Sequence, residues 1–322
     1  MNRLLTVTIM LTMTIGNNVL AQEEDAPNEN RSTTEIQGKA SDAQDKADKL
    51  ITNRRFRAQT GSLSKLSMNM SMSYNGGSLA KPLAADRPNI ANAGDTTSIS
   101  GINGTVNASY RLDKLNRLNL GTGLQMLAPF NDTIETDDQR AEREFEENKG
   151  DLDASNPYLS YTHMNRFFDV QTVFTGGMTQ YTASNLTDVG YQNSADFSLN
   201  TMYDFGGSAF SLGALVLYNR YFFDKDVEEF LAFQNRDVFG FLPQAEYVIN
   251  DMFNLRTIIR SNWYQNTVAD VNDYEQRPIT QSVGLGISLN RDVFLYPNIQ
   301  FAYENLQAEN TNVGFTANIN MF

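Results

Sequence analysis

The sequence contains no cysteine in its 322 residues. This absence excludes a disulfide framework, thiol catalysis, a thiolate metal site and a lipid-bearing cysteine. Long apolar runs are missing as well, since no stretch after the first residues approaches the roughly 18 consecutive apolar residues that a transmembrane helix needs. Basic residues are outnumbered, 25 against 38 acidic ones, and the net charge of -13 makes nucleic acid a poor partner. We therefore expect no helical membrane span, no nucleic-acid partner, no cofactor and no metal.

The first 21 residues have the pattern of a secretory signal peptide. Asn2 and Arg3 form a short polar start, residues 4–15 are mostly apolar, and small side chains precede a cleavage site after Ala21. The apolar run is too short and too rich in threonine to cross a bilayer. We therefore expect that the protein is exported and that residues 1–21 are removed.

Residues 22–60 form a polar, charged leader that we expect in the periplasm. Ile36, Ala40, Ala43, Ala47 and Leu50 recur at helical spacing, although alanine contributes little buried area. Two interpretations stay open: a disordered leader, or a weak helix docked in a lumen or against a partner. Near its end Arg54, Arg55 and Arg57 form a basic cluster, which predicts either contact with anionic lipid headgroups or a simple tether.

From residue 63 to the end of the chain, apolar and polar residues alternate with a period of two, which is typical of strands. In the last such segment Val313, Phe315 and Ile319 alternate with asparagine and threonine. We predict about twelve strands, near residues 65–74, 98–111, 117–128, 156–164, 168–181, 193–204, 208–223, 237–250, 252–265, 282–289, 294–304 and 312–321. The segment 156–164 is the weakest of them, because it shows no clear inner and outer set.

Two features favour a closed barrel over a water-soluble sheet. The minor face carries Asn, Ser, Thr and Gly instead of Lys and Glu, which suits a hydrated lumen better than an exposed sheet face. Short and long connections also alternate strictly, so that both ends of a twelve-stranded barrel fall on the side of the short turns. The predicted fold is all-β: a closed antiparallel transmembrane β-barrel over residues 61–322.

Aromatic residues gather towards the predicted strand ends, and the chain ends in Phe322. Over residues 63–322 the chain resembles bacterial outer-membrane β-barrel proteins of the porin-like kind, with no particular family indicated. The resemblance implies a place in the outer membrane of a Gram-negative bacterium, with outer-membrane lipids and lipopolysaccharide as neighbours. The chain departs from the usual pattern because Asn318 and Asn320 occupy positions in phase with Phe322 that are commonly apolar.

The single histidine gives little support for an enzyme. Outer-membrane phospholipases resemble this chain in strand number, and that resemblance implies a serine two residues after the histidine. Here Asn165 stands two residues after His163, beside a short turn on the periplasmic side. We expect a histidine at the barrel rim and no enzymatic activity.

An acidic loop is predicted outside the cell or in the pore mouth. Its carboxylates include Asp137, Asp138, Glu142, Glu144, Glu146 and Glu147. Such a cluster would attract cations, bind calcium loosely or bridge through divalent cations to lipopolysaccharide phosphates, or it is simply a solvated loop.

A second set of charges is predicted on the lumen face. It consists of Asp196, Glu246, Arg256, Arg260 and Glu304. Arg256 and Arg260 lie on one strand and point the same way, so they would either steer an anionic solute or pair with Glu246 on the neighbouring strand. Pairing is the favoured interpretation, because charges in a narrow lumen gain from compensation.

The sequence predicts a passive outer-membrane channel for small hydrophilic solutes, with a mild cation preference set by the acidic loop. The alternative is a non-conducting structural or adhesive surface protein whose barrel is closed by its own side chains or by the leader.

Overall fold

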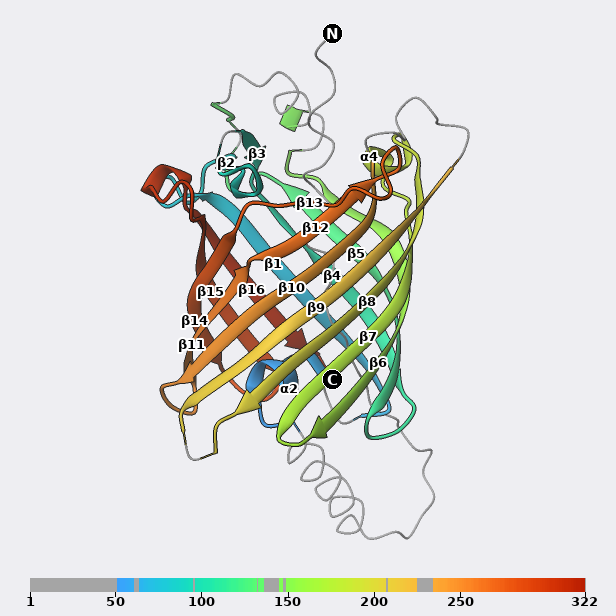
Figure 1. Ribbon diagram of the computed structural model, residues 1–322, viewed down its shortest axis with the longest axis vertical. Helices are drawn as coiled ribbons and strands as arrows, with labels where there is room; N and C mark the ends of the chain where they lie inside the picture. The colour runs from blue at the N-terminus through green and yellow to red at the C-terminus, as the bar shows by residue number, and fades with distance from the viewer. Residues whose placement is uncertain are drawn as a thin grey trace.

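The computed structural model describes residues 51–322 apart from residues 61–63, 95, 132, 136–144, 147–148, 207, 225–233 and 322. The predicted signal peptide and most of the leader lie outside the described residues. The described chain forms a closed antiparallel barrel of twelve strands with tilted walls (Figure 1). The predicted fold class is confirmed.

The wall strands follow one another in chain order. They are β1 (Leu66–Ser78), β4 (Gly101–Arg111), β5 (Asn116–Leu127), β6 (Leu152–Phe167), β7 (Val170–Gln180), β8 (Tyr191–Asp204), β9 (Phe210–Phe223), β10 (Asn235–Val248), β11 (Phe253–Arg260) with its continuation β12 (Asn262–Thr267), β14 (Thr280–Ser288), β15 (Val293–Ala302) and β16 (Asn312–Asn320). Both β11 and β12 pair with β10, so the two segments form one wall strand interrupted at Ser261.

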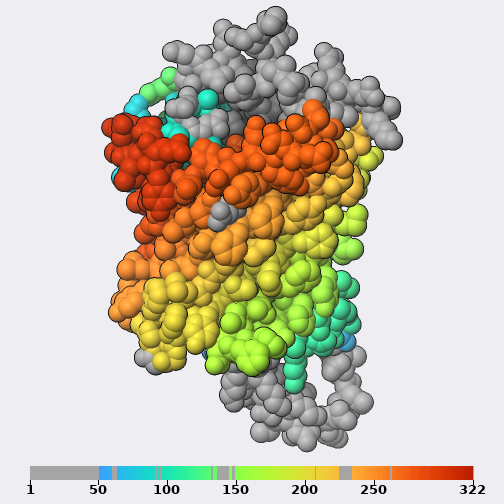
Figure 2. Space-filling model, viewed as in Figure 1, coloured from blue at the N-terminus to red at the C-terminus, as the bar shows by residue number. Residues whose placement is uncertain are grey.

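The alternation of the sequence places opposite chemistry on the two faces of the wall. In β5, Leu118 and Leu120 point outward and are 40% and 64% exposed, whereas Arg117 and Asn119 point into the barrel and are each 1% exposed. An apolar outer face and a polar inner face are what a strand needs between lipid and a wet interior. The face seen in Figure 2 is a continuous surface in which the strands β7 to β12 lie side by side.

The barrel closes by pairing its first strand with its last. β1 and β16 are antiparallel, with Asn69 opposite Asn320 and Tyr74 opposite Phe315. On the inner face the seam carries polar side-chain bonds, from Asn69 Nδ2 to Asn320 Oδ1 at 2.6 Å and from Ser71 Oγ to Asn318 Oδ1 at 2.9 Å. Closure leaves no free strand edge, and lipid cannot satisfy the polar groups of such an edge.

Short turns join the strands at one end of the barrel, and longer connections join them at the other. The longer ones carry β2 (Asp86–Pro88), β3 (Thr97–Ile99), α4 (Ser184–Thr187), β13 (Glu275–Gln276) and the 3-10 turns η2 (Ile90–Asn92) and η4 (Ala308–Asn310). In Figure 1 these lie at the top, and the short turns lie at the bottom. Among the described residues no helix is long and apolar enough to span a membrane.

The segment with the weakest sequence pattern contains a register shift. The pairing of β5 with β6 runs from Gly121 opposite Tyr158 to Gly123 opposite Ser155, so β6 carries an extra residue there. Asn156, before Pro157, has a φ of 56°. A bulge of this kind changes the face that later side chains point to. Beyond it the pairing is regular, and the alternation is weak because the inner set contains the apolar Met164 and the outer set contains His163.

Candidate functional site

A short peptide segment crosses the lumen at the end with the short turns. It comprises residues 51–60 and includes the helix α2 (Arg54–Thr60), which contacts β14, β15 and β16 from inside (Figure 1). Asn53 begins this helix, because its Oδ1 accepts a hydrogen bond from the backbone N–H of Phe56 at 3.1 Å. Asparagine is a preferred residue at this position. We call residues 51–60 the lumen segment.

Apolar side chains fix the lumen segment to two sides of the wall. Ile51 and Phe56 form a buried apolar cluster with Met164 of β6, Val173 of β7 and Met202 of β8. Ala58 packs against Phe294 and Tyr296 of β15. The side chain of Phe56 is fully buried, and burying a side chain of this size contributes about 1.5–3 kcal/mol.

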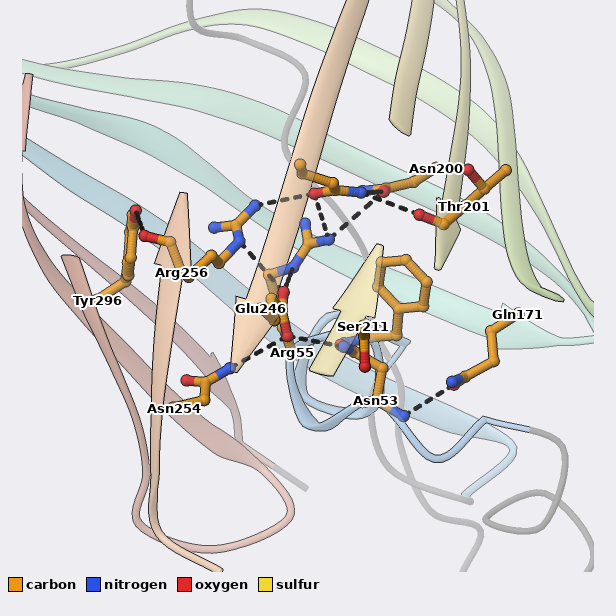
Figure 3. A network of polar contacts seen from close by, with 12 residues as sticks. Asn53, Arg55, Gln171, Asn200, Thr201, Ser211, Glu246, Asn254, Arg256 and Tyr296 are labelled. Carbon is orange, nitrogen blue, oxygen red and sulfur yellow. Dashed lines mark hydrogen bonds and ion pairs between the residues drawn. The ribbon is translucent and has the colours of Figure 1, made fainter. Parts of the chain in front are cut away.

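A buried charge network surrounds Glu246 on the inner face of β10 (Figure 3). Its Oε1 lies 3.3 Å from Arg256 Nε and 3.5 Å from Arg55 Nε, and all three side chains are at most 7% exposed. Its Oε2 accepts hydrogen bonds from Asn53 Nδ2 at 2.8 Å and from Asn254 Nδ2 at 3.1 Å. Glu246 therefore holds two residues of the lumen segment and two of β11. Charges out of water need this kind of pairing.

Neutral amide groups extend the network across the lumen. Arg55 Nη2 donates to Gln244 Oε1 at 3.0 Å, and Gln244 Nε2 donates to Asn200 Oδ1 of β8 at 2.6 Å. On β7, Gln171 Oε1 accepts from the backbone N–H groups of Thr52 and Asn53 at 2.7 and 2.8 Å (Figure 3). These contacts satisfy backbone groups of the segment before the helix begins, which a buried backbone requires.

One end of the lumen segment reaches the barrel rim. Arg54 Nη2 lies 2.7 Å from Asp251 Oδ1, and its Nη1 donates to the backbone carbonyl of Asn250 at 2.5 Å. Asp251 is fully exposed in the turn between β10 and β11. This pair is therefore a solvent-exposed contact beside a buried network.

The other half of the lumen is lined differently. Tyr191, Leu217, Tyr221, Val238 and Leu242 form a buried cluster on β8, β9 and β10. The cluster is extended by Tyr181, Leu186 and Val189 of the connection between β7 and β8, with further contacts from Leu215, Phe223, Ile258 and Trp263. Apolar and aromatic packing therefore folds this long connection into the mouth of the barrel.

The lumen charges predicted from sequence fall into different places. Glu246 and Arg256 lie opposite each other in the pairing of β10 with β11 and form the ion pair described above. Arg260 lies further along β11, near Arg256 and Tyr296. Asp196 of β8 accepts hydrogen bonds from Thr179 Oγ1 at 3.0 Å and Ser194 Oγ at 2.8 Å.

Glu304 does not lie on the lumen face where the alternation placed it. β15 ends at Ala302, and Glu304 is exposed in the connection that follows. The predicted strand 294–304 is two residues longer than β15 at its C-terminal end, because a strand boundary carries a weak sequence signal.

Most of the predicted acidic loop cannot be placed. Asp137, Asp138, Glu142, Glu144 and Glu147 lie outside the described residues. Glu146 is exposed and forms an ion pair with Lys149 at 2.9 Å. Binding of divalent cations by this loop stays a prediction.

Two further sequence expectations can be compared with the structure. His163 lies at the short-turn end, where its Nδ1 is 2.8 Å from Asn116 Oδ1. Arg55, expected at lipid headgroups or in a tether, is instead buried inside the barrel. A helix of the leader docked in the lumen was one of the two interpretations left open, but the basic cluster was not assigned to it.

Comparisons with known proteins give likeness at the level of architecture. No protein-family model matches the chain, and no curated protein matches it. Among solved structures, an outer membrane channel from Pseudomonas putida F1 shares 11% identity, with a TM-score of 0.48 over 81% of this chain and 97% of that one. The porin KdgM, in complex with disordered oligogalacturonate, shares 8% identity, with a TM-score of 0.39 over 79% and 98%. OmpF of Salmonella typhi shares 7% identity, with a TM-score of 0.35 over 79% and 95%.

The class of the protein follows from its own strand pairing. Twelve antiparallel strands close on themselves, the outer face is apolar, the inner face is polar, and short turns alternate with long connections. The chain is a β-barrel protein of the outer-membrane type.

Proposed function

We propose that the protein is an outer-membrane channel through which small hydrophilic solutes diffuse, and that the lumen segment narrows its periplasmic half. The observation that carries this proposal is the inner face of β16, β1 and β4. It consists of small neutral polar residues: Ser71, Ser73, Thr105, Asn107, Ser109, Thr316 and Asn318. Side chains of this kind exchange hydrogen bonds with water easily and leave room for it.

The polar contacts of the lumen segment favour a removable restriction. Hydrogen bonds to Gln171 and Gln244 can be replaced by water when the segment leaves, whereas a fully apolar plug would leave an unfavourable cavity. The lumen segment also lies at the short-turn end, where β1 begins.

A second candidate function is a closed structural or adhesive barrel. The observation that favours it is the reach of the lumen segment, which contacts β7, β8 and β10 on one side and β15 and β16 on the other. A segment that bridges the lumen in this way would stop solute flow if it stayed in place.

Conductance in planar bilayers tests both functions. The full mature chain should give discrete steps, and deletion of residues 51–60 should raise the single-channel conductance at least about twofold, because the lumen widens and conductance follows the open section. A matched control is Arg54→Gln, which keeps the segment and removes only its rim contact.

The outcomes separate the two candidates. Steps from the full chain support the channel. Conductance seen only after deletion of residues 51–60 supports the closed barrel with the lumen segment as its plug. Absence of conductance from both the full chain and the deletion variant contradicts the channel. Fractionation of cells into inner and outer membranes, with the protein in the outer fraction, tests its location independently.

A further inference from the structure

Arg117 is a fully buried arginine with no counter-charge among the residues that the structure describes. It lies at the start of β5 on the inner face, is 1% exposed, and is the largest fully buried side chain of the described chain. Its Nε and Nη1 atoms have no hydrogen-bond acceptor within the part of the chain that the structure describes. A buried guanidinium in this state is costly, because it has lost water and gained no partner.

Two further arginines add to the positive charge. Arg111 of β4 is directly opposite Arg117 in the strand pairing, and like charges in this position repel each other. Arg291, in the turn between β14 and β15, is near enough for its charge to act on both. On the other side, the residue of β6 opposite Arg117 is Thr162, which is neutral. We call Arg111, Arg117 and Arg291 the arginine cluster.

The described carboxylates nearest to the cluster, Asp113 and Asp292, lie in the turns at the rim and form no ion pair with Arg117. Asp292 lies 3.6 Å from Arg291. The Asp113 carboxylate accepts hydrogen bonds from the backbone N–H groups of Leu115 and Asn116 in the β4–β5 turn. These hydrogen bonds lower the pKa of Asp113 below its usual value. Asp113 therefore stays charged at neutral pH, but it faces its own turn.

Elsewhere in the same barrel, two buried arginines lie beside a carboxylate. Arg55 and Arg256 share the carboxylate of Glu246 at 3.5 and 3.3 Å. Arg117 has the same kind of donors, and among the described residues no carboxylate stands to it as Glu246 does to Arg55 and Arg256. A planar guanidinium fork matches the two oxygens of a carboxylate or phosphate.

We propose that the arginine cluster is a binding site for an oxyanion carried by a solute in the lumen, such as a phosphate or carboxylate group. The inference rests on the proposed channel and specifies its solute class as anionic. It is opposite in sign to the cation preference expected from the acidic loop, because the charge that faces the solute at the periplasmic end is positive.

Calorimetric titration of the folded full-length protein in detergent with inorganic phosphate tests the site without requiring conductance. We expect saturable binding, and Arg117→Met should weaken it about tenfold or more, because a hydrogen-bonded charge partner is removed. Arg117→Lys keeps the positive charge but lacks the planar guanidinium group. Its phosphate affinity should lie between those of the wild type and Arg117→Met. Lys114→Gln is the matched control, since it removes one positive charge from the exposed turn beside the cluster.

Folding of each variant is checked by heat-modifiable gel mobility. Arg117→Met removes an uncompensated buried charge, so it should fold at least as well as the wild type. Arg291→Gln gives a second, independent reduction in phosphate affinity should Arg117→Met fail to fold. Absence of saturable phosphate binding, or unchanged binding in both variants, would overturn the proposal.

Reversal potentials in a potassium chloride gradient distinguish failure of the site from failure of the channel. Anion selectivity that decreases in Arg117→Met supports both the site and the channel. Phosphate binding without conductance keeps the site and rejects the channel. Conductance with cation selectivity and no phosphate binding keeps the channel and rejects the site.

Discussion

The two ends of the lumen are built from different chemistry. At the end with the short turns, Glu246 and Arg256 hold the lumen segment through charges and amides. At the end with the long connections, which we propose to be the outer one, Leu217 and Tyr221 hold the connection between β7 and β8 through apolar and aromatic packing. Both ends place a piece of chain inside the barrel, but the forces that keep it there differ.

The difference predicts that the two pieces of chain respond to different changes. Contacts between charges weaken when one partner is neutralised, whereas apolar packing weakens when volume is removed. Substitutions that remove charge should therefore release the lumen segment and leave the outer connection in place. Substitutions that remove apolar volume at the outer end should do the reverse.

The largest effect is expected from Glu246→Gln. Neutralising this residue leaves Arg55 and Arg256 buried together without a counter-charge, which costs about 3 kcal/mol or more. The cost is relieved when Arg55 leaves the lumen, so tryptic cleavage within residues 54–57 of the vesicle-embedded protein should accelerate about a hundredfold.

Two variants control this prediction. Glu309→Gln neutralises an exposed carboxylate in the outer connection after β15 and should not change the cleavage rate. The double variant Glu246→Gln with Arg55→Gln removes the orphaned charge as well and should restore part of the protection. An unchanged cleavage rate in Glu246→Gln would mean that charge does not hold the lumen segment.

A smaller effect is expected from Leu217→Ala at the end with the long connections. Leu217 is 2% exposed inside the aromatic cluster, and its truncation should cost about 2 kcal/mol locally. Hydrogen exchange of the Leu186 and Thr187 amides should become at least about tenfold faster. Tryptic cleavage of the lumen segment should stay at the wild-type rate.

Leu212→Ala is the matched control for that experiment. Leu212 lies on the same strand and is 43% exposed on the outer face, so its loss should not change exchange in the connection between β7 and β8. Faster cleavage of the lumen segment in Leu217→Ala would show that the two ends are coupled and would remove the contrast between them.

The smallest effect is expected from Asp251→Asn, which removes the exposed partner of Arg54. Exposed ion pairs contribute little, so cleavage should accelerate less than about threefold. In about 1 M salt, where the Debye length falls to roughly 3 Å, this solvent-exposed contact should weaken and the difference from the wild type should shrink. Asp188→Asn, in the outer connection, should show no change at any salt concentration.

Much of the barrel could be predicted from the sequence because its wall repeats one physical requirement. Each strand separates lipid from water, so polarity must alternate along it, as in Leu118, Asn119 and Leu120. The requirement fails locally at the β6 bulge, where the extra residue is specified by pairing with β5 and not by polarity.

The candidate site was only partly predictable, for a related reason. Glu246 and Arg256 sit on adjacent strands in direct register, so counting along a hairpin brings them together. Arg55 contacts the same carboxylate although it lies 191 residues before Glu246 in the chain, and no local sequence pattern encodes such a contact. Arg117 was overlooked because one arginine in a strand end is common; its missing counter-charge is visible only in three dimensions.

The seam between β1 and β16 has a consequence for the order of events during assembly. Residues 66–78 cannot gain their second neighbour until residues 312–320 are available, so the ring is completed by the contact of greatest separation along the chain. Until then β1 and β15 each present an unpaired edge, which is prone to pairing with other chains. Assembly of this barrel without aggregation therefore depends on protecting both edges until the last strand is available to pair with the first.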